Sequence, residues 1–176
     1  MRHTLHSPQL DIKSDGFTLV ELLVVISIVA ISLSIALPNY SDFVHQKSVE
    51  TAANDFKSAV GFARSEAIKR GKNIQIRPVG KTQEPWGTLT DGWHVFYTTR
   101  SNQVMVLLTH DLESGSIGVS GSGKRGFYLD QRTGRLGTGA NQVICFSAVD
   151  NSANLEKYTV TLNQVGSAVT STSSGC

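Results

Sequence analysis

The sequence predicts an α+β protein in which one long amino-terminal helix precedes a small antiparallel β domain. An almost unbroken apolar run extends from Phe17 to Leu37, and amphipathic helical periodicity follows it as far as Arg70. Beyond Gly71 the pattern changes to short alternating segments rich in β-branched and aromatic residues, separated by turn residues. The change of period predicts the change from helix to strands.

Residues 1–16 form a polar leader ahead of the apolar run. As a helix, residues 17–37 would be about 30 Å long, which is the hydrocarbon thickness of a bilayer, so we predict a transmembrane segment. Its single charged residue is Glu21, and an acid inside such a segment costs free energy, less so near one end. We therefore expect Glu21 to have a function.

Three interpretations of this segment follow from the residues. A secretory signal would be cut after its apolar core, for which Ser34-Ile35-Ala36 has the small-x-small pattern, but this core is long and Glu21 would have no purpose. A plain membrane anchor explains the length but neither Gly16 nor Glu21. A cut directly after Gly16 and before the apolar segment gives the glycine a purpose, because glycine lets the scissile peptide lie extended. We favour this third interpretation.

Residues 38–70 are predicted to form the amphipathic second half of the helix. Pro38 removes one backbone hydrogen bond, so we expect a kink there and not an end, because helical periodicity resumes beyond it. Glu66 and Arg70 are predicted to pair at i,i+4, and Gly71 to end the helix. The apolar stripe that the β domain would cover consists of Phe43, Val49, Ala52, Ala53, Phe56, Ala59, Val60, Ala63, Ala67 and Ile68.

Residues 71–176 are predicted to form the β domain. Its expected strands are residues 72–78, 93–97, 104–109, 143–149 and 157–162, with a hairpin that joins 127–129 to 134–136. The Gly/Ser-rich segment 114–126 is predicted to be a loop, and residues 165–176 a polar tail. Gly118 to Lys124 match the spacing of a phosphate-binding loop, but Arg125 stands where that motif needs Ser or Thr. We therefore do not expect a nucleotide site.

Composition and spacing disfavour several other function classes. The net charge of +2 gives no global reason to expect nucleic-acid binding. No histidine stands at metal-ligand spacing from a cysteine, and no nucleophile elbow is present, so we expect no metal, no cofactor and no catalysis. The densest basic cluster, a candidate patch for DNA phosphates, consists of Lys124, Arg125, Arg132 and Arg135.

The two cysteines are Cys145 and the last residue, Cys176. A bond between them would fasten the carboxyl-terminal tail and would suit an oxidising compartment. Two unrelated thiols are the alternative.

The motif at the start of the helix resembles the processing site of type IV pilins and type II secretion pseudopilins: Gly16, then F-T-L-V-E, an apolar helix, and Pro38. The A-R-S-E-A stretch within residues 58–71 makes the chain similar to the GspH/FimT/FimU branch of minor pilins and pseudopilins. The resemblance implies a pilin-like fold. It also implies that a membrane prepilin peptidase cuts between Gly16 and Phe17 and methylates the new amine of Phe17.

The same resemblance implies assembly and not catalysis. The Glu21 carboxylate would pair with the Phe17 amine of the next subunit in the filament core, where an unpaired charge is costly. Other minor and major pilins or pseudopilins would be the partners. Before assembly the protein would sit in inner-membrane lipid by a single pass, with its β domain in the periplasm. It would then prime or cap a type IV pilus or a type II secretion pseudopilus, between which the sequence does not decide.

Two further points come from the branch. Cys145 and Cys176 look like the pair that closes the carboxyl-terminal region of FimU-type pilins by a disulfide. The alternative function is DNA binding, as in FimT relatives, which use a carboxyl-terminal G-R-x-R motif. The corresponding segment here, residues 165–169, lacks both arginines, and this departure disfavours DNA as a partner.

Overall fold

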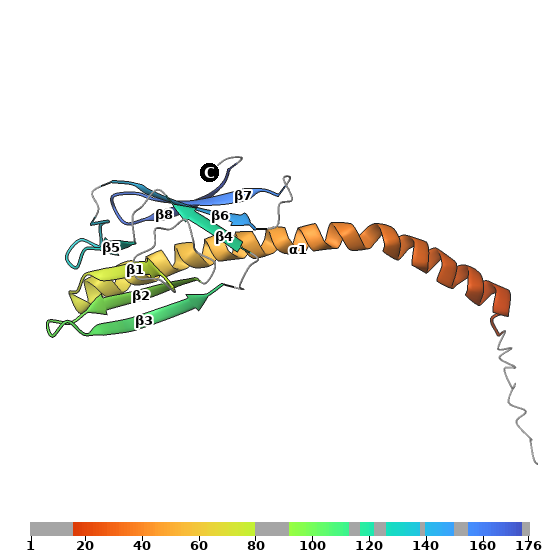
Figure 1. Ribbon diagram of the computed structural model, residues 1–176, viewed down its shortest axis with the longest axis horizontal. Coiled ribbons are helices and arrows are strands. Elements are labelled where there is room, and N and C mark those ends of the chain that lie inside the picture. The colour runs from red at the N-terminus through yellow and green to blue at the C-terminus, as the bar shows by residue number, and fades with distance from the viewer. Residues whose placement is uncertain are drawn as a thin grey trace, which may run out of the picture. The chain divides into compact units, whose positions relative to one another are not determined.

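The computed structural model describes residues 16–79, 92–112, 117–121, 126–137, 140–149 and 155–173. Within them the chain forms a helix, α1 (Leu19–Arg70), and then the strands β1 (Ile74–Pro78), β2 (Gly92–Thr98), β3 (Val104–Asp111), β4 (Ile117–Gly121), β5 (Phe127–Leu129), β6 (Gln142–Ala148), β7 (Lys157–Leu162) and β8 (Ala168–Ser173) (Figure 1). The chain divides into two compact units, Met1–Tyr40 and Ser41–Cys176. The predicted α+β class is confirmed.

Helix α1 begins and ends at recognisable capping residues. Its backbone remains helical through Pro38, so the helix does not end there; the kink itself stays a prediction. At the carboxyl end Gly71 adopts a left-handed φ of 57°, and the Lys72 N–H donates to the Ala67 carbonyl oxygen at 3.3 Å. This arrangement is the usual glycine-terminated helix end. The predicted end at Arg70 is therefore confirmed.

The strands form two antiparallel sheets of four. One has the order β3-β2-β1-β5 and the other the order β4-β6-β7-β8. In the first sheet β1 pairs with both β2 and β5. Among the described strands β3 pairs with β2 alone and is therefore one edge of the sheet. In the second sheet β4 and β8 are the two edges.

Two strands lie where the sequence predicted none. The Gly/Ser-rich segment was predicted to be a loop, yet β4 pairs along β6, and its Ile117 and Val119 are buried at period two. The predicted polar tail likewise contains β8, which pairs along β7. Their composition is that of loops, and pairing with a neighbouring strand overrides it. The predicted hairpin is reduced on its second side to a single bridge between Leu129 and Leu136.

The core forms where the helix meets both sheets. Phe56 of α1 is fully buried, and its ring meets the rings of Trp93 at 5.1 Å and Phe146 at 5.6 Å, one from each sheet. All the buried hydrophobic residues of the described chain lie at or beyond Val49, so they belong to the unit Ser41–Cys176. Most of the predicted apolar stripe is buried, but Phe43 and Ile68 are more than half exposed, contrary to the prediction.

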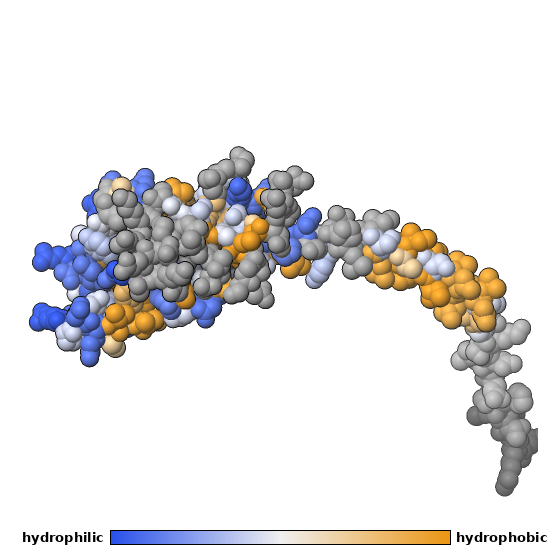
Figure 2. Space-filling model, in the orientation of Figure 1, coloured by the Kyte–Doolittle hydropathy of each residue, from blue (hydrophilic) through white to orange (hydrophobic). Residues whose placement is uncertain are grey.

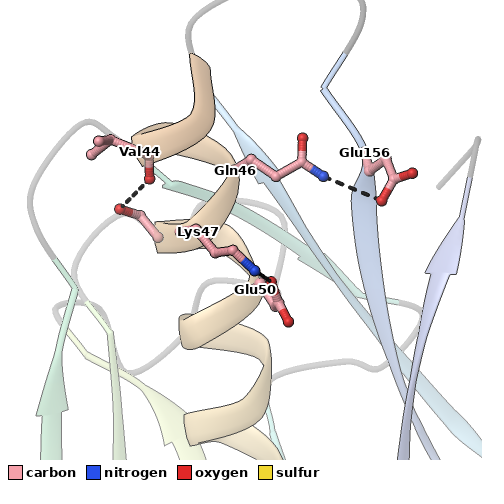
Figure 3. A network of polar contacts seen from close by, with 6 residues as sticks. Val44, Gln46, Lys47, Glu50 and Glu156 are labelled. Atoms are coloured by element: carbon pink, nitrogen blue, oxygen red, sulfur yellow. Dashed lines mark hydrogen bonds and ion pairs between the residues drawn. The ribbon is translucent and has the colours of Figure 1, made fainter. Parts of the chain in front are cut away.

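Polar contacts fasten both ends of this part of the helix. Near its start the Gln46 side-chain amide donates to the Glu156 carboxylate just before β7, at 3.2 Å (Figure 3). Near its end the predicted pair of Glu66 with Arg70 is confirmed, and Lys69 lies 3.7 Å from the same acid. Glu66 is buried, and its hydrogen bond from Arg70 lowers the pKa of its carboxyl below the usual value. The charge is thus retained inside the fold.

Candidate functional site

The residues around the predicted cleavage point lie outside the helix and are accessible. Gly16, Phe17 and Thr18 are not helical, and the Phe17 side chain is 82% exposed. A Cβ atom built on Gly16 would meet nothing within 4 Å, so packing within this chain does not require glycine there. If cleavage after Gly16 requires glycine, the requirement would come from another molecule or from the conformation of that peptide.

Thr18 caps the helix, a role that the sequence analysis missed. Its Oγ1 accepts a hydrogen bond from the Glu21 N–H at 3.2 Å, and its carbonyl oxygen accepts one from the Leu22 N–H at 3.1 Å. These two bonds define an N-cap residue, and Thr18 through Glu21 have the S/T-x-x-E sequence of a capping box. That short pattern could have located the helix start from the sequence.

Glu21 stands at the third helical position, with its side chain exposed. A carboxylate in the first turn interacts favourably with the positive end of the helix dipole. Cleavage after Gly16 would create an ammonium group at Phe17, next to that same positive end. The Glu21 carboxylate is the described acid of the first turn that can offset this charge, within its own chain or from a neighbouring one.

The first unit exposes its apolar side chains. The large hydrophobic residues from Leu19 to Leu33 are each between 48% and 79% exposed. They appear orange along the amino-terminal part of the helix (Figure 2). In the part of the chain that the structure describes, no helix combines the length and hydropathy needed to cross a membrane. The transmembrane assignment of residues 17–37 thus stays a prediction, but this apolar surface needs a partner, either lipid or protein.

A second exposed apolar surface lies on β3. Its residues Val104, Met105, Val106 and Leu108 are 59%, 45%, 54% and 37% exposed. Figure 2 shows orange atoms in the region where Figure 1 draws β2 and β3. Since β3 is an edge strand, one side of its backbone also lacks a partner strand among the described residues. Soluble proteins often protect such an edge with lysine, proline or a β-bulge; β3 has no lysine or proline, but its pairing with β2 is irregular between Val106 and Leu108.

A groove in the unit Ser41–Cys176 lies between the helix and the end of β3. The groove has a volume of about 370 Å³ and is lined by the start of this unit's helical part, including Phe43 and Val44, and by His110 to Leu112 at the end of β3. Asp55 lies 3.8 Å from His110 across it. It is wide open and does not enclose a small molecule, and the exposed side chains from Val104 to Leu108 are not among its lining residues.

A family model described as type II transport protein GspH matches residues 52–166. The chain belongs to the GspH family. A second model, the prokaryotic N-terminal methylation motif, matches residues 12–37, which include Gly16, Phe17 and Glu21. The resemblance recognised in the sequence is confirmed.

Individual relatives agree with this membership. Fimbrial protein Q of Moraxella bovis is 32% identical over 150 residues, 84% of this chain and 85% of that protein. Two fimbrial proteins of Pseudomonas aeruginosa are each 41% identical over 82 residues, 44% of this chain. The match spans 53% of the length of these two relatives, about half.

Solved structures show the same fold. The type IV minor pilin FimU of Pseudomonas aeruginosa superposes with a TM-score of 0.59 at 16% identity, over 76% of this chain and 98% of that one. The minor pseudopilin EpsH of the Vibrio cholerae type 2 secretion system superposes with a TM-score of 0.53 at 12% identity, over 71% and 97%. The predicted pilin-like fold of this GspH-family chain is thus confirmed.

The structure describes two of the four residues in the basic cluster predicted for this GspH-family chain. Arg132 and Arg135 are exposed on the turn after β5, whereas Lys124 and Arg125 lie outside the described residues. Asp130 stands in the same turn and is held there by hydrogen bonds. Its carboxylate accepts hydrogen bonds from the Thr133 N–H, the Arg132 N–H and the Thr133 hydroxyl, each at 3.0 Å, and they lower the pKa of Asp130.

One predicted disulfide cysteine and two histidines of the β domain make contacts within the fold of this GspH-family chain. Cys145 is buried on β6 and is disulfide-bonded. Cys176 lies outside the described residues, so its pairing with Cys145 stays a prediction. His94 contacts the Thr109 hydroxyl at 3.0 Å, and His110 stacks on Trp93 with ring centroids 4.2 Å apart. No cluster of three or more metal-ligating side chains occurs among the described residues.

Proposed function

We propose that this chain is a minor pilin or pseudopilin that a prepilin peptidase cuts between Gly16 and Phe17, and that then primes or caps a type IV pilus or a type II secretion pseudopilus. The observation that carries the proposal is the start of α1. Gly16 is accessible, and a larger side chain would fit there without a clash. It lies just before an exposed apolar helix that carries Glu21 in its first turn.

The exposed apolar helix of the first unit contacts lipid before assembly and other pilins afterwards. Before assembly, inner-membrane lipid covers the apolar side chains of the first unit, with the β domain in the periplasm. In the filament the helices of neighbouring pilins replace the lipid. Glu21 then pairs with the Phe17 amine of an adjoining subunit, since an unpaired charge among packed apolar helices is unfavourable.

Mass spectrometry of the protein purified from its own cells tests the processing step. We expect a mature chain that begins at Phe17 and carries one added methyl group on its amine. A chain that begins at Leu37 would instead identify an ordinary secretory signal. Residues 1–16 still attached, in cells that trim their other pilins normally, would overturn the proposal.

We further propose that β3 and the adjoining groove form the lateral contact of the β domain with a neighbouring pilin subunit. An edge strand that has no partner strand on one side among the described residues, and that exposes apolar side chains, suits addition of a strand or an apolar face from another chain. Val104 and Val106 stand opposite Thr98 and Phe96 of β2, so both lie on the same face of the sheet. A partner with an apolar face can cover them together.

Replacing Val104 by lysine tests this contact. Because Val104 is 59% exposed, we expect an unchanged melting temperature of the isolated unit but a severalfold lower amount of the protein in sheared filaments. Val169→Lys is a matched control, since Val169 is also 59% exposed and lies on β8, an edge of the other sheet. Equal incorporation of the two variants would contradict a contact through β3.

A further inference from the structure

The helix cap at Thr18 lies just after the Gly16–Phe17 peptide bond, the proposed cleavage point. An N-cap residue has non-helical backbone angles, so a helix capped by Thr18 does not extend to the residues before it. Accordingly Gly16 and Phe17 are outside the helix, although the apolar run predicted a helix that begins at Phe17. The helix that starts with the Thr18 cap therefore leaves the Gly16–Phe17 peptide outside it.

We propose that Thr18 is a positioning residue for prepilin cleavage, because its hydroxyl ends the helix two residues after the scissile bond and so keeps that bond open to the peptidase. This inference rests on the proposed function. A peptide bond within a helix is held at helical backbone angles with its carbonyl oxygen hydrogen-bonded along the helix, whereas exposed non-helical segments are the usual sites of proteolysis. Gly16 and the 82% exposed Phe17 meet this requirement.

The sequence before the cut offers other residues at which a helix can begin. Ser14 and Asp15 are also residue types that favour the N-cap position. A helix begun at Asp15 would contain Gly16 and Phe17 in its first turn. Thr18 competes with these starts, and its advantage comes from the bond between its Oγ1 and the Glu21 N–H. Glu21 at the third helical position adds to this advantage through the helix dipole.

Thr18→Val removes the hydroxyl while it keeps the shape of the side chain. From the usual effect of losing an N-cap, we expect cleavage of the full-length prepilin in membranes that contain the peptidase to slow about fivefold. Thr18→Ser restores the acceptor and should be cut at about the wild-type rate. The measurement is a time course of leader removal by mass, normalised to the membrane-inserted amount of each variant.

A second set of variants separates this role from a general effect on folding. Ser14→Ala with Asp15→Ala removes the competing caps and should restore the cleavage rate in the Thr18→Val background, while by itself it should leave the rate unchanged. Loss of a direct contact between Thr18 and the peptidase would not be rescued in this way. Failure of that rescue, or a wild-type rate for Thr18→Val, overturns the inference. Absence of wild-type cleavage at Gly16 would instead overturn the proposed function.

Discussion

Glu21→Gln is expected to be cut after Gly16 like the wild type, yet to enter filaments at least about tenfold less. Glutamine keeps a hydrogen-bonding group at the third helical position, where it is also accepted in a capping box, so the helix start should stay intact. Only the negative charge is lost. The Phe17 ammonium of the adjoining subunit would then be left without a counter-charge among apolar helices.

The size of the effect follows from the cost of an unpaired charge. Removing one partner of a buried ion pair costs about 3–5 kcal/mol, and about 1.4 kcal/mol already corresponds to a factor of ten. The measurement is the ratio of protein in sheared filaments to protein in membranes, with the mass of the mature chain determined in parallel. That mass shows whether cleavage was preserved.

Glu50→Gln provides the matched control on the same helix. Glu50 pairs with Lys47 at 2.7 Å at the surface, so the loss of its charge should change incorporation little. If Glu21→Gln assembled as well as wild type while Glu21→Ala did not, capping alone would explain Glu21. The proposed pairing between subunits would then be wrong.

Phe56→Ala is expected to lower the free energy of unfolding of the unit Ser41–Cys176 by about 3–5 kcal/mol. Phe56 is fully buried and joins the helix to both sheets through the rings of Trp93, Phe127 and Phe146. Its loss would leave a cavity at the point where the three elements meet. Since small domains have only about 5–15 kcal/mol of stability, most of the unit's stability could be lost.

Denaturant unfolding of the oxidised unit measures this effect. Phe62→Ala is the control, because Phe62 lies on the same helix but is 37% exposed, and we expect it to cost no more than about 1 kcal/mol. Equal losses for the two variants would show that the helix–sheet core is not centred on Phe56.

The strands illustrate what sequence patterns can and cannot predict. β2 and β6 were predicted because aromatic and branched residues dominate them. β4 and β8 were missed because Gly, Ser and Thr dominate them, and they are strands through their pairing with β6 and β7. Phe43 and Ile68 were assigned to the buried stripe by spacing, but periodicity cannot tell how far a sheet extends over a helix.

The sequence by itself determined the long helix, its end at Gly71, the family and the candidate residues Gly16, Phe17 and Glu21. These features depend on residues close together in the chain, such as caps, apolar runs and short motifs. The tertiary structure alone decided that Glu66 is buried with its charge, and that the apolar strand β3 lies at an open edge. Both depend on which distant segments become neighbours, because burial and strand order arise from packing between segments and not from the pattern within any one of them.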